Sequence, residues 1–235
     1  MRNDAFTCLF ITACFTGMRT GEVCALTWDD INFEDKTITI IINHNVYSKP
    51  KDEKGKWFIG TPKTINSERK IYICDTLLIA LNNYKNKQEN LRKMYGKKYR
   101  YYHLEEVKNK HGKVIEYMIV ETDRKIKKMC HLNLVFTKHD GTYTGTDIVK
   151  YPYKVIHDEL GIENCRFYDL RGSFATKALR SGVEIKDVAE ILGHSRIETT
   201  ENYYISSSTE NQKNATKLIE KQIQSEVISN IINFK

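Results

Sequence analysis

The spacing of apolar residues in the first third of the chain predicts helices that flank a small sheet. Residues 5–15 form a nearly continuous apolar run of helix length that stops at Thr16-Gly17, and a second helix is expected over 20–26. Runs rich in β-branched and apolar residues at 37–42, 56–60 and 69–73 predict one three-stranded antiparallel sheet. A further helix is expected over 76–84.

The last part of the chain has helical spacing. Helices are expected over 147–160, 169–181 and 185–192, because each run ends next to a glycine, namely Gly161, Gly182 and Gly193. Residues 214–234 carry an apolar stripe on a polar background, which predicts a tail helix that must be covered. The pattern as a whole indicates an α+β fold that is mostly α-helical.

Residues 85–128 show no clear period. Their segment 97–102 reads Lys-Lys-Tyr-Arg-Tyr-Tyr. Basic residues interleaved with aromatics suit phosphate contact and base stacking. The alternative interpretation, which we prefer, is a solvated helix face whose tyrosines cover the core.

Composition narrows the possible functions only slightly. A chain of 235 residues is long enough for one large domain or two small ones, and a net charge of +7 permits a polyanionic partner without requiring one. The six cysteines are scattered and have no zinc-ligand spacing, so we expect free thiols and no metal site. No apolar run reaches the roughly 18 residues of a membrane span, so an intracellular, cytoplasmic protein is expected.

Several polar residues stand beside the predicted turns and helix ends. They are Arg19, Lys63, Tyr168, Arg171 and His194, followed by Tyr203 and Tyr204 nine and ten residues after the histidine. Each has an ordinary structural explanation when it is taken alone. Together they form a set that could attack a phosphodiester without metal: two arginines can grip one phosphate, lysine and histidine can move protons, and tyrosine can act as the nucleophile.

Five segments in order resemble the tyrosine recombinase family, also called phage-type integrases. They are Thr-Gly-Met-Arg-Thr-Gly-Glu at 16–22, Thr-Pro-Lys-Thr at 61–64, Tyr-Asp-Leu-Arg-Gly-Ser-Phe-Ala-Thr at 168–176, Leu-Gly-His-Ser at 192–195 and Thr-Thr-Glu-Asn-Tyr-Tyr at 199–204. The resemblance runs from residue 5 to about residue 220. It implies the catalytic-domain fold of that family.

The resemblance also implies a role for each matching residue. Arg19 and Arg171 would bind the scissile phosphate, and Glu22 would support Arg19. Lys63, at the tip of a hairpin, would protonate the leaving 5′ oxygen, and His194 would donate to the phosphate oxygens. A tyrosine would form a 3′-phosphotyrosyl link, with no cofactor and no metal.

The sequence departs from the family pattern at two of these positions. Tyr168 stands where the family usually has histidine, and a tyrosine is a poor base near neutral pH. The nucleophile is ambiguous because the family spacing admits both Tyr203 and Tyr204. We assign Tyr204, because a polar residue, Ser206, follows it at the position where relatives often have histidine.

The resemblance sets the expected domain organisation and partners. We expect one catalytic domain over residues 1–235, with 85–143 as an enlarged insertion and 212–235 as a C-terminal tail helix. We expect the N-terminal DNA-clamping domain of the family to be missing. The expected partner is double-stranded DNA at the nucleoid, and the tail could dock on a neighbouring subunit of a tetramer or pack on its own domain.

Two other functions compete with a recombinase from a prophage or other mobile element. Residues 185–204 also resemble a helix-turn-helix, which would make the chain a non-catalytic DNA-binding regulator. A type IB topoisomerase would share the chemistry but relax supercoils. The regulator does not explain Arg19, Lys63 and Arg171, and the small size with the Gly-His-Ser segment favours a recombinase over a topoisomerase.

Overall fold

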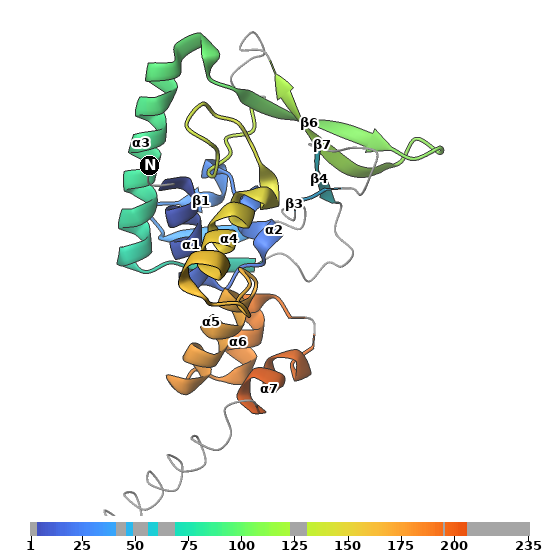
Figure 1. The fold of residues 1–235 in the computed structure, drawn as a ribbon. Coiled ribbons are helices and arrows are strands. Elements are labelled where there is room, and N and C mark those ends of the chain that lie inside the picture. The colour runs from blue at the N-terminus through green and yellow to red at the C-terminus, as the bar shows by residue number, and fades with distance from the viewer. Residues whose placement is uncertain are drawn as a thin grey trace, which may run out of the picture.

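The computed structural model describes residues 4–40, 46–48, 56–60, 69–122, 131–194 and 196–205, with 202–205 by backbone alone. The helices in these ranges are α1 (Asp4–Thr16), α2 (Thr20–Ala25), α3 (Asp75–Tyr95), α4 (Lys150–Leu160), α5 (Asp169–Arg180), α6 (Ile185–Leu192) and α7 (Glu198–Ile205). The strands are β1 (Ile31–Asn32), β2 (Thr37–Ile40), β3 (Val46–Tyr47), β4 (Trp57–Gly60), β5 (Arg69–Tyr72), β6 (Tyr101–Lys108) and β7 (Val114–Thr122). Figure 1 shows them as an upper body of helices and sheets with α5, α6 and α7 grouped below it.

The helices expected from apolar spacing are present as α1, α2, α5 and α6. The helix expected over 76–84 continues to Tyr95, because Leu77, Leu81, Tyr84 and Gln88 extend one buried face through residues that are otherwise polar. The helix expected over 147–160 is divided into a 3₁₀ turn, Gly145–Val149, and α4.

The prediction of a single three-stranded sheet is wrong. Strands β1, β2 and β5 form one antiparallel sheet, and β3, β4, β7 and β6 form a second in that order. The strand expected over 56–60 exists as β4, but it pairs with β3 and β7 and not with β5. Strands β4 and β5 therefore lie in different sheets and do not form the expected hairpin. Lys63, expected at its tip, lies outside the described residues.

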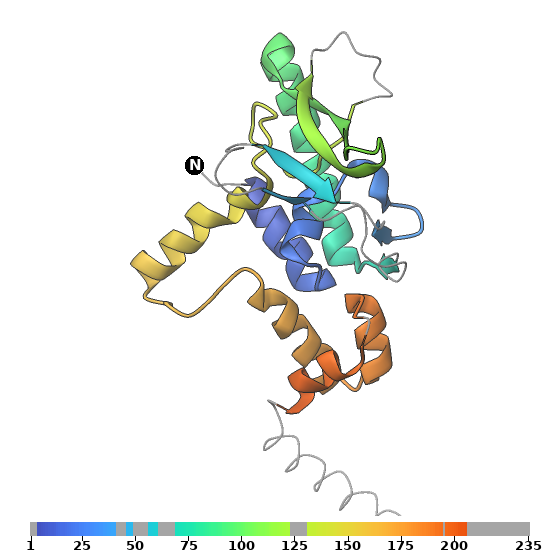
Figure 2. The ribbon, with the colours of Figure 1, turned by 90° about the vertical axis from the view of Figure 1, so that its right-hand side faces the viewer.

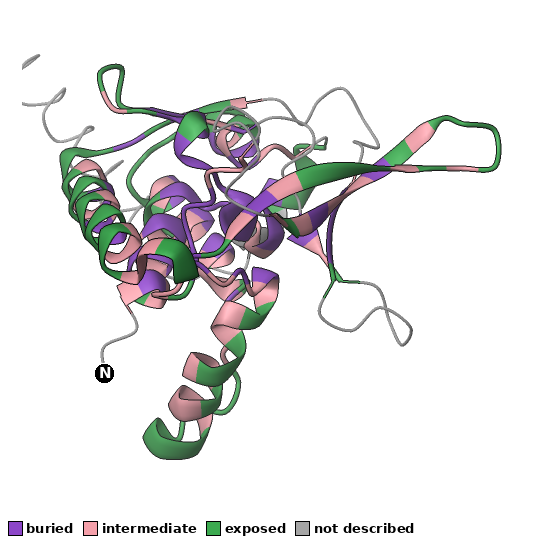
Figure 3. Ribbon diagram, turned by 90° about the horizontal axis from the view of Figure 1, so that it is seen from above, coloured by how far each residue is buried: buried purple, intermediate pink, exposed green. Residues whose placement is uncertain are grey.

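Residues 85–128, whose sequence shows no clear period, contain the end of α3 and a long hairpin of β6 and β7. The interpretation of 97–102 as one helix face is wrong, because residues 96–98 form a 3₁₀ turn and residues 101–108 form a strand. The expectation that tyrosines of this segment cover the core is correct for Tyr99 and Tyr102, which are buried. Figure 3 shows the hairpin as an arm with buried positions near its base and exposed positions towards its tip.

Two groups of buried apolar residues hold the fold together. The larger joins α1, α2, α3 and both sheets, and the smaller is formed by Ala175, Leu179, Val188 and Leu192 of α5 and α6. Helix α1 contacts both α3 and α5, and α6 contacts β5, so both link the upper body to the lower helices. The turned view of Figure 2 shows these lower helices beneath the upper body. The site described below lies where the two groups meet.

Two general features complete the description. The cysteines within the described ranges are all free thiols. None of the described helices has the length and apolarity that crossing a membrane would require.

Candidate active site

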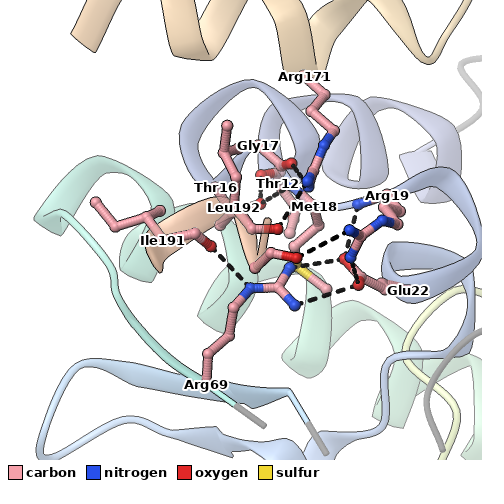
Figure 4. A network of polar contacts seen from close by, with 11 residues as sticks. Thr12, Thr16, Gly17, Met18, Arg19, Glu22, Arg69, Arg171, Ile191 and Leu192 are labelled. Atoms are coloured by element: carbon pink, nitrogen blue, oxygen red, sulfur yellow. Dashed lines mark hydrogen bonds and ion pairs between the residues drawn. The ribbon is translucent and has the colours of Figure 1, made fainter. Parts of the chain in front are cut away.

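Arg171 lies at the centre of a polar network between α5 and the ends of α1 and α6 (Figure 4). It is only 1% exposed although it carries a charge. Its Nη1 donates to the carbonyl oxygen of Gly17 at 2.8 Å, and its Nη2 donates to that of Leu192 at 2.7 Å. Its Nε has no hydrogen-bond partner among the described residues. Because a guanidinium has five N–H donors, Arg171 keeps donor capacity for a further acceptor.

Arg19 also donates to the end of α6, at the residue that follows the Leu192 carbonyl bound by Arg171. It precedes α2, and its backbone N–H donates to Glu22 Oε2 at 2.8 Å, which caps the start of the helix. Its Nη1 donates to Glu22 Oε1 at 2.8 Å, and its Nη2 donates to the carbonyl oxygen of Gly193 at 3.0 Å. The side chain is 37% exposed, so a ligand in solution can reach it.

A third arginine, Arg69 at the start of β5, belongs to the network, and the sequence analysis did not identify it. Its Nε donates to the carbonyl oxygen of Ile191 at 2.7 Å. Its Nη2 and Nη1 donate to the two carboxylate oxygens of Glu22 at 2.7 and 3.2 Å. Three arginines from three elements thus donate to the consecutive carbonyls of residues 191–193 at the end of α6.

His194 follows this segment directly and is half-buried. Its Nδ1 lies 2.8 Å from the hydroxyl of Thr200 in α7. Burial, together with the charges of Arg171, Arg19 and Arg69, lowers the pKa of His194 to about 4, and Glu22 acts in the opposite direction. The imidazole is therefore neutral at neutral pH.

The site has an excess of positive charge. Burial and the charges of Arg19 and Arg69 lower the pKa of Arg171 to about 10, so it remains a cation at neutral pH. Burial alone would raise the pKa of Glu22, but the hydrogen bonds and charges of Arg69 and Arg19 outweigh burial and lower it. One carboxylate therefore faces three guanidinium groups, which favours the binding of an anion such as phosphate.

The structure describes few side-chain contacts or none for the other predicted site residues. Tyr168 precedes α5 and is 46% exposed, and no described residue makes a hydrogen bond with its side chain. It is one of the groups that influence the pKa of Arg171, which indicates that the two side chains are neighbours. Tyr203 and Tyr204 belong to α7 by their backbone, but their side chains, like Lys63, lie outside the described part of the chain.

Within the described ranges, no group of His, Cys, Asp and Glu side chains could hold a metal ion. The site is built instead from arginines around a segment that ends in a neutral histidine. These features describe a positively charged site, suited to an anion, next to a helix that carries two tyrosines.

The chain belongs to the phage integrase family, whose sequence pattern it matches over residues 1–211. It is 28% identical to a XerC-like tyrosine recombinase of Caldanaerobacter subterraneus, over 90% of this chain and 48% of that protein. It is 27% identical to the ICEBs1 integrase of Bacillus subtilis, over 85% of this chain and 44% of that protein. The chain thus spans about half the length of these curated relatives. The resemblance stated from the sequence motifs is confirmed.

Solved structures share the fold. The Tn1549 transposon integrase in complex with circular intermediate DNA is similar with a TM-score of 0.56 and 21% identity, over 89% of this chain and 58% of that chain. The same integrase in complex with transposon right end DNA gives a TM-score of 0.55 at 21% identity, over 83% and 52% of the two chains. At this identity the likeness shows the fold alone, and the expected catalytic-domain fold is confirmed apart from its sheets.

Proposed function

We propose that this chain is the catalytic domain of a site-specific DNA recombinase that cleaves and rejoins strands through a 3′-phosphotyrosyl link. The observation that carries the proposal is the convergence of Arg19 and Arg171 on the neighbouring carbonyls of Gly193 and Leu192, directly before His194. Three segments that are distant in sequence thereby face one small region. Family membership supports the same chemistry.

In the proposed reaction, Arg19 and Arg171 bind the non-bridging oxygens of the scissile phosphate. Their charge stabilises the additional negative charge of the pentavalent transition state. His194 is neutral and donates one hydrogen bond to a phosphate oxygen. Tyr168, at the position where the family usually has histidine, can donate through its phenol but is not suited to accept a proton near neutral pH.

A tyrosine of α7, which we assign as Tyr204 in preference to Tyr203, loses its phenolic proton to water and attacks phosphorus through that oxygen. The new tyrosyl ester forms as the bond to the 5′ oxygen breaks, and Lys63 gives a proton to that leaving oxygen. The 5′ hydroxyl of another strand then attacks the ester, which restores the tyrosine and a phosphodiester. The number of ester bonds is conserved, so the sequence of steps consumes no ATP.

The substrate and biological setting are proposed from the relatives. Double-stranded DNA is the substrate, and the parent protein serves a mobile element, since the relatives include the ICEBs1 integrase and, at 25% identity, a transposase from transposon Tn916 of Enterococcus faecalis. We further propose that residues 212–235 dock on a neighbouring copy when the protein assembles on DNA. Removal of these residues should leave single-site DNA binding intact but reduce crosslinked oligomers on DNA.

A covalent adduct tests the central proposal. The protein is incubated with a pool of nicked duplexes of randomised sequence, and the products are separated on denaturing gels. An adduct should form, and it should disappear in Tyr204→Phe but persist in Tyr151→Phe, a matched change at a tyrosine of α4 that is 73% exposed. Loss in Tyr203→Phe alone would move the nucleophile by one residue.

A DNA-binding regulator is the competing function. It is favoured by the short connection between α6 and α7, which has the form of a helix-turn-helix. It does not account for Arg171 and Arg69, two buried arginines that donate to the carbonyl oxygens of Leu192 and Ile191 beside His194. DNA binding without any adduct in the experiment above would support the regulator.

A further inference from the structure

The hydrogen bond between His194 and Thr200 joins two parts of the site that differ in their expected roles. His194 follows α6, whereas Thr200 belongs to the first turn of α7, the helix that carries Tyr203 and Tyr204. The Nδ1 to Oγ1 distance is 2.8 Å, and Thr200 is 0% exposed. A fully buried hydroxyl beside a half-buried histidine has few ways to meet its hydrogen-bonding requirement.

The direction of this hydrogen bond follows from the surroundings of Thr200. Within the described ranges, His194 Nδ1 is the hydrogen-bond partner of the Thr200 hydroxyl. If Nδ1 carried the proton and donated it to Oγ1, the hydroxyl hydrogen would be buried without an acceptor among these residues. Unmet buried donors are rare because they lose hydration without replacement. The hydroxyl therefore donates, and Nδ1 accepts.

We propose that Thr200 is a positioning residue that holds neutral His194 in the tautomer with its proton on Nε2. The inference rests on the proposed function of His194 as a donor to the scissile phosphate. A neutral imidazole has only one N–H, so its tautomer decides which nitrogen can donate. With Nδ1 engaged by Thr200, the donor is the ring nitrogen on the opposite side.

The surroundings of His194 keep its ring neutral, so the tautomer decides which ring nitrogen can donate. Burial disfavours a proton on the ring most, the charges of Arg171, Arg19 and Arg69 add to this, and Glu22 acts in the opposite direction. The three cations outweigh the single carboxylate. His194 therefore cannot act as a doubly protonated donor near neutral pH, and it needs a partner that selects between its two neutral forms.

The position of Thr200 also links this selection to the nucleophile. Residues 203 and 204 follow Thr200 by one helical turn in α7. The helix whose backbone includes residues 203 and 204 is therefore the one that makes the hydrogen bond to His194. Displacement of α7 would release the nucleophile and the histidine donor together.

The test measures the tautomer directly. The full chain, labelled with ¹⁵N at histidine, is studied by long-range ¹H–¹⁵N correlation at neutral pH, and His194→Gln identifies the resonances of residue 194. Thr200→Val removes the hydroxyl while nearly preserving side-chain volume, and Thr200→Ser retains the hydroxyl. The rate of adduct formation with a nicked duplex is measured on the same samples.

The unaltered chain should show the proton on Nε2. Thr200→Val should shift the population towards the other tautomer and slow adduct formation by about ten-fold or more, the scale on which partners that orient histidines act elsewhere. Thr200→Ser should keep the tautomer and the rate of adduct formation of the unaltered chain. This pattern would not follow from a purely structural role, because a packing defect does not select a tautomer.

Two results would overturn the inference, and neither depends on activity. One is an unaltered chain with its proton on Nδ1, which needs no variant to fold. The other is a Thr200→Val chain that keeps the original tautomer. Absence of adduct in every sample, with the expected tautomer and its expected shift, would overturn the proposed function and leave the assignment of the hydrogen bond standing.

Discussion

Arg69 and Glu22 form a two-pronged ion pair that is nearly sealed from solvent. The guanidinium and carboxylate groups meet at 2.7 and 3.2 Å, and their side chains are 5% and 7% exposed. The same carboxylate accepts from Arg19. Glu22 therefore connects Arg69, which is buried, to Arg19, whose side chain reaches solvent.

Replacing Arg69 with lysine should reduce stability even though the charge is kept. An ammonium group cannot make the paired contact with Glu22 and also reach the carbonyl oxygen of Ile191. Breaking a buried ion pair costs about 3–5 kcal/mol, so we expect a loss of about 2–3 kcal/mol for this partial break. Urea unfolding measures it.

Arg100→Lys is the matched control for that experiment. Arg100 pairs with Glu121 at 2.9 Å, but both side chains are about half exposed, at 47% and 51%. Surface pairs contribute about 0–1 kcal/mol, so this change should have little effect. Equal losses in the two variants would show that the buried pair is not a main support of the site.

Arg69 also shows which part of the site the sequence could reveal. Arg19, Arg171 and His194 stand in recognisable segments, and the structure brings them together. The sequence pattern identifies Arg69 only as the first residue of a strand. Alternation along β5 places it on the same face as Ile71, which is buried, so an arginine on that face implies a carboxylate partner. That the partner is Glu22 depends on tertiary packing, which a strand pattern does not contain.

The same limit explains the error in the sheets. Trp57, Phe58 and Ile59 are apolar in succession and buried, which correctly predicts a strand covered on both faces. Their pairing partner, β7, lies in a segment without a clear period and far along the chain. Local pattern identifies a strand, but only the packed fold determines its neighbours.

Shortening the β6–β7 arm should leave the domain stable. Residues 108–115 include no buried position, and Val107 pairs with Glu116 across the hairpin. Replacing 108–115 with Asn-Gly, a favoured two-residue turn, should change the free energy of unfolding by less than about 1 kcal/mol.

Tyr102→Ala, at the base of the same hairpin, is the contrasting change. Tyr102 is buried, and its hydroxyl accepts from the backbone N–H of Tyr143 at 3.0 Å. Loss of a buried aromatic costs about 3–5 kcal/mol. If the shortened arm were as damaging as this substitution in thermal unfolding, the tip would have a structural role that its exposure does not indicate.

His194 should make stability depend on pH in the weakly acidic range. Its pKa is lowered from 6.5 to about 4 by burial and then by Arg171, Arg19 and Arg69. The unfolded chain therefore binds the proton first as the pH falls. The stability contribution is complete above about pH 6.5 and is lost progressively towards about pH 4.

Urea unfolding at about pH 7 and about pH 5 measures this effect. His194→Asn should reduce the loss of stability between the two pH values, whereas His111→Asn, at an exposed position near the arm tip, should keep it. An unchanged loss in His194→Asn would mean that other groups account for the pH dependence.

Gly193→Ala should damage the site through both backbone strain and a steric clash. Gly193 has φ +66, a left-handed conformation that favours glycine, and an added Cβ would lie 2.9 Å from Nη1 of Arg69. Gly161 provides a matched control, because it ends α4 at φ +65 with nothing within 4 Å of its Cβ position. Gly161→Ala should cost about 1 kcal/mol from the backbone alone. Gly193→Ala should cost at least about 1 kcal/mol more, because Arg69 must move away from Glu22.

The excess cost of Gly193→Ala should shrink in an Arg69→Lys background, since two changes that act through one contact are not additive. Denaturant unfolding of the three variants and the double variant measures this coupling, and an excess that is the same in both backgrounds would show that Gly193 acts independently of Arg69.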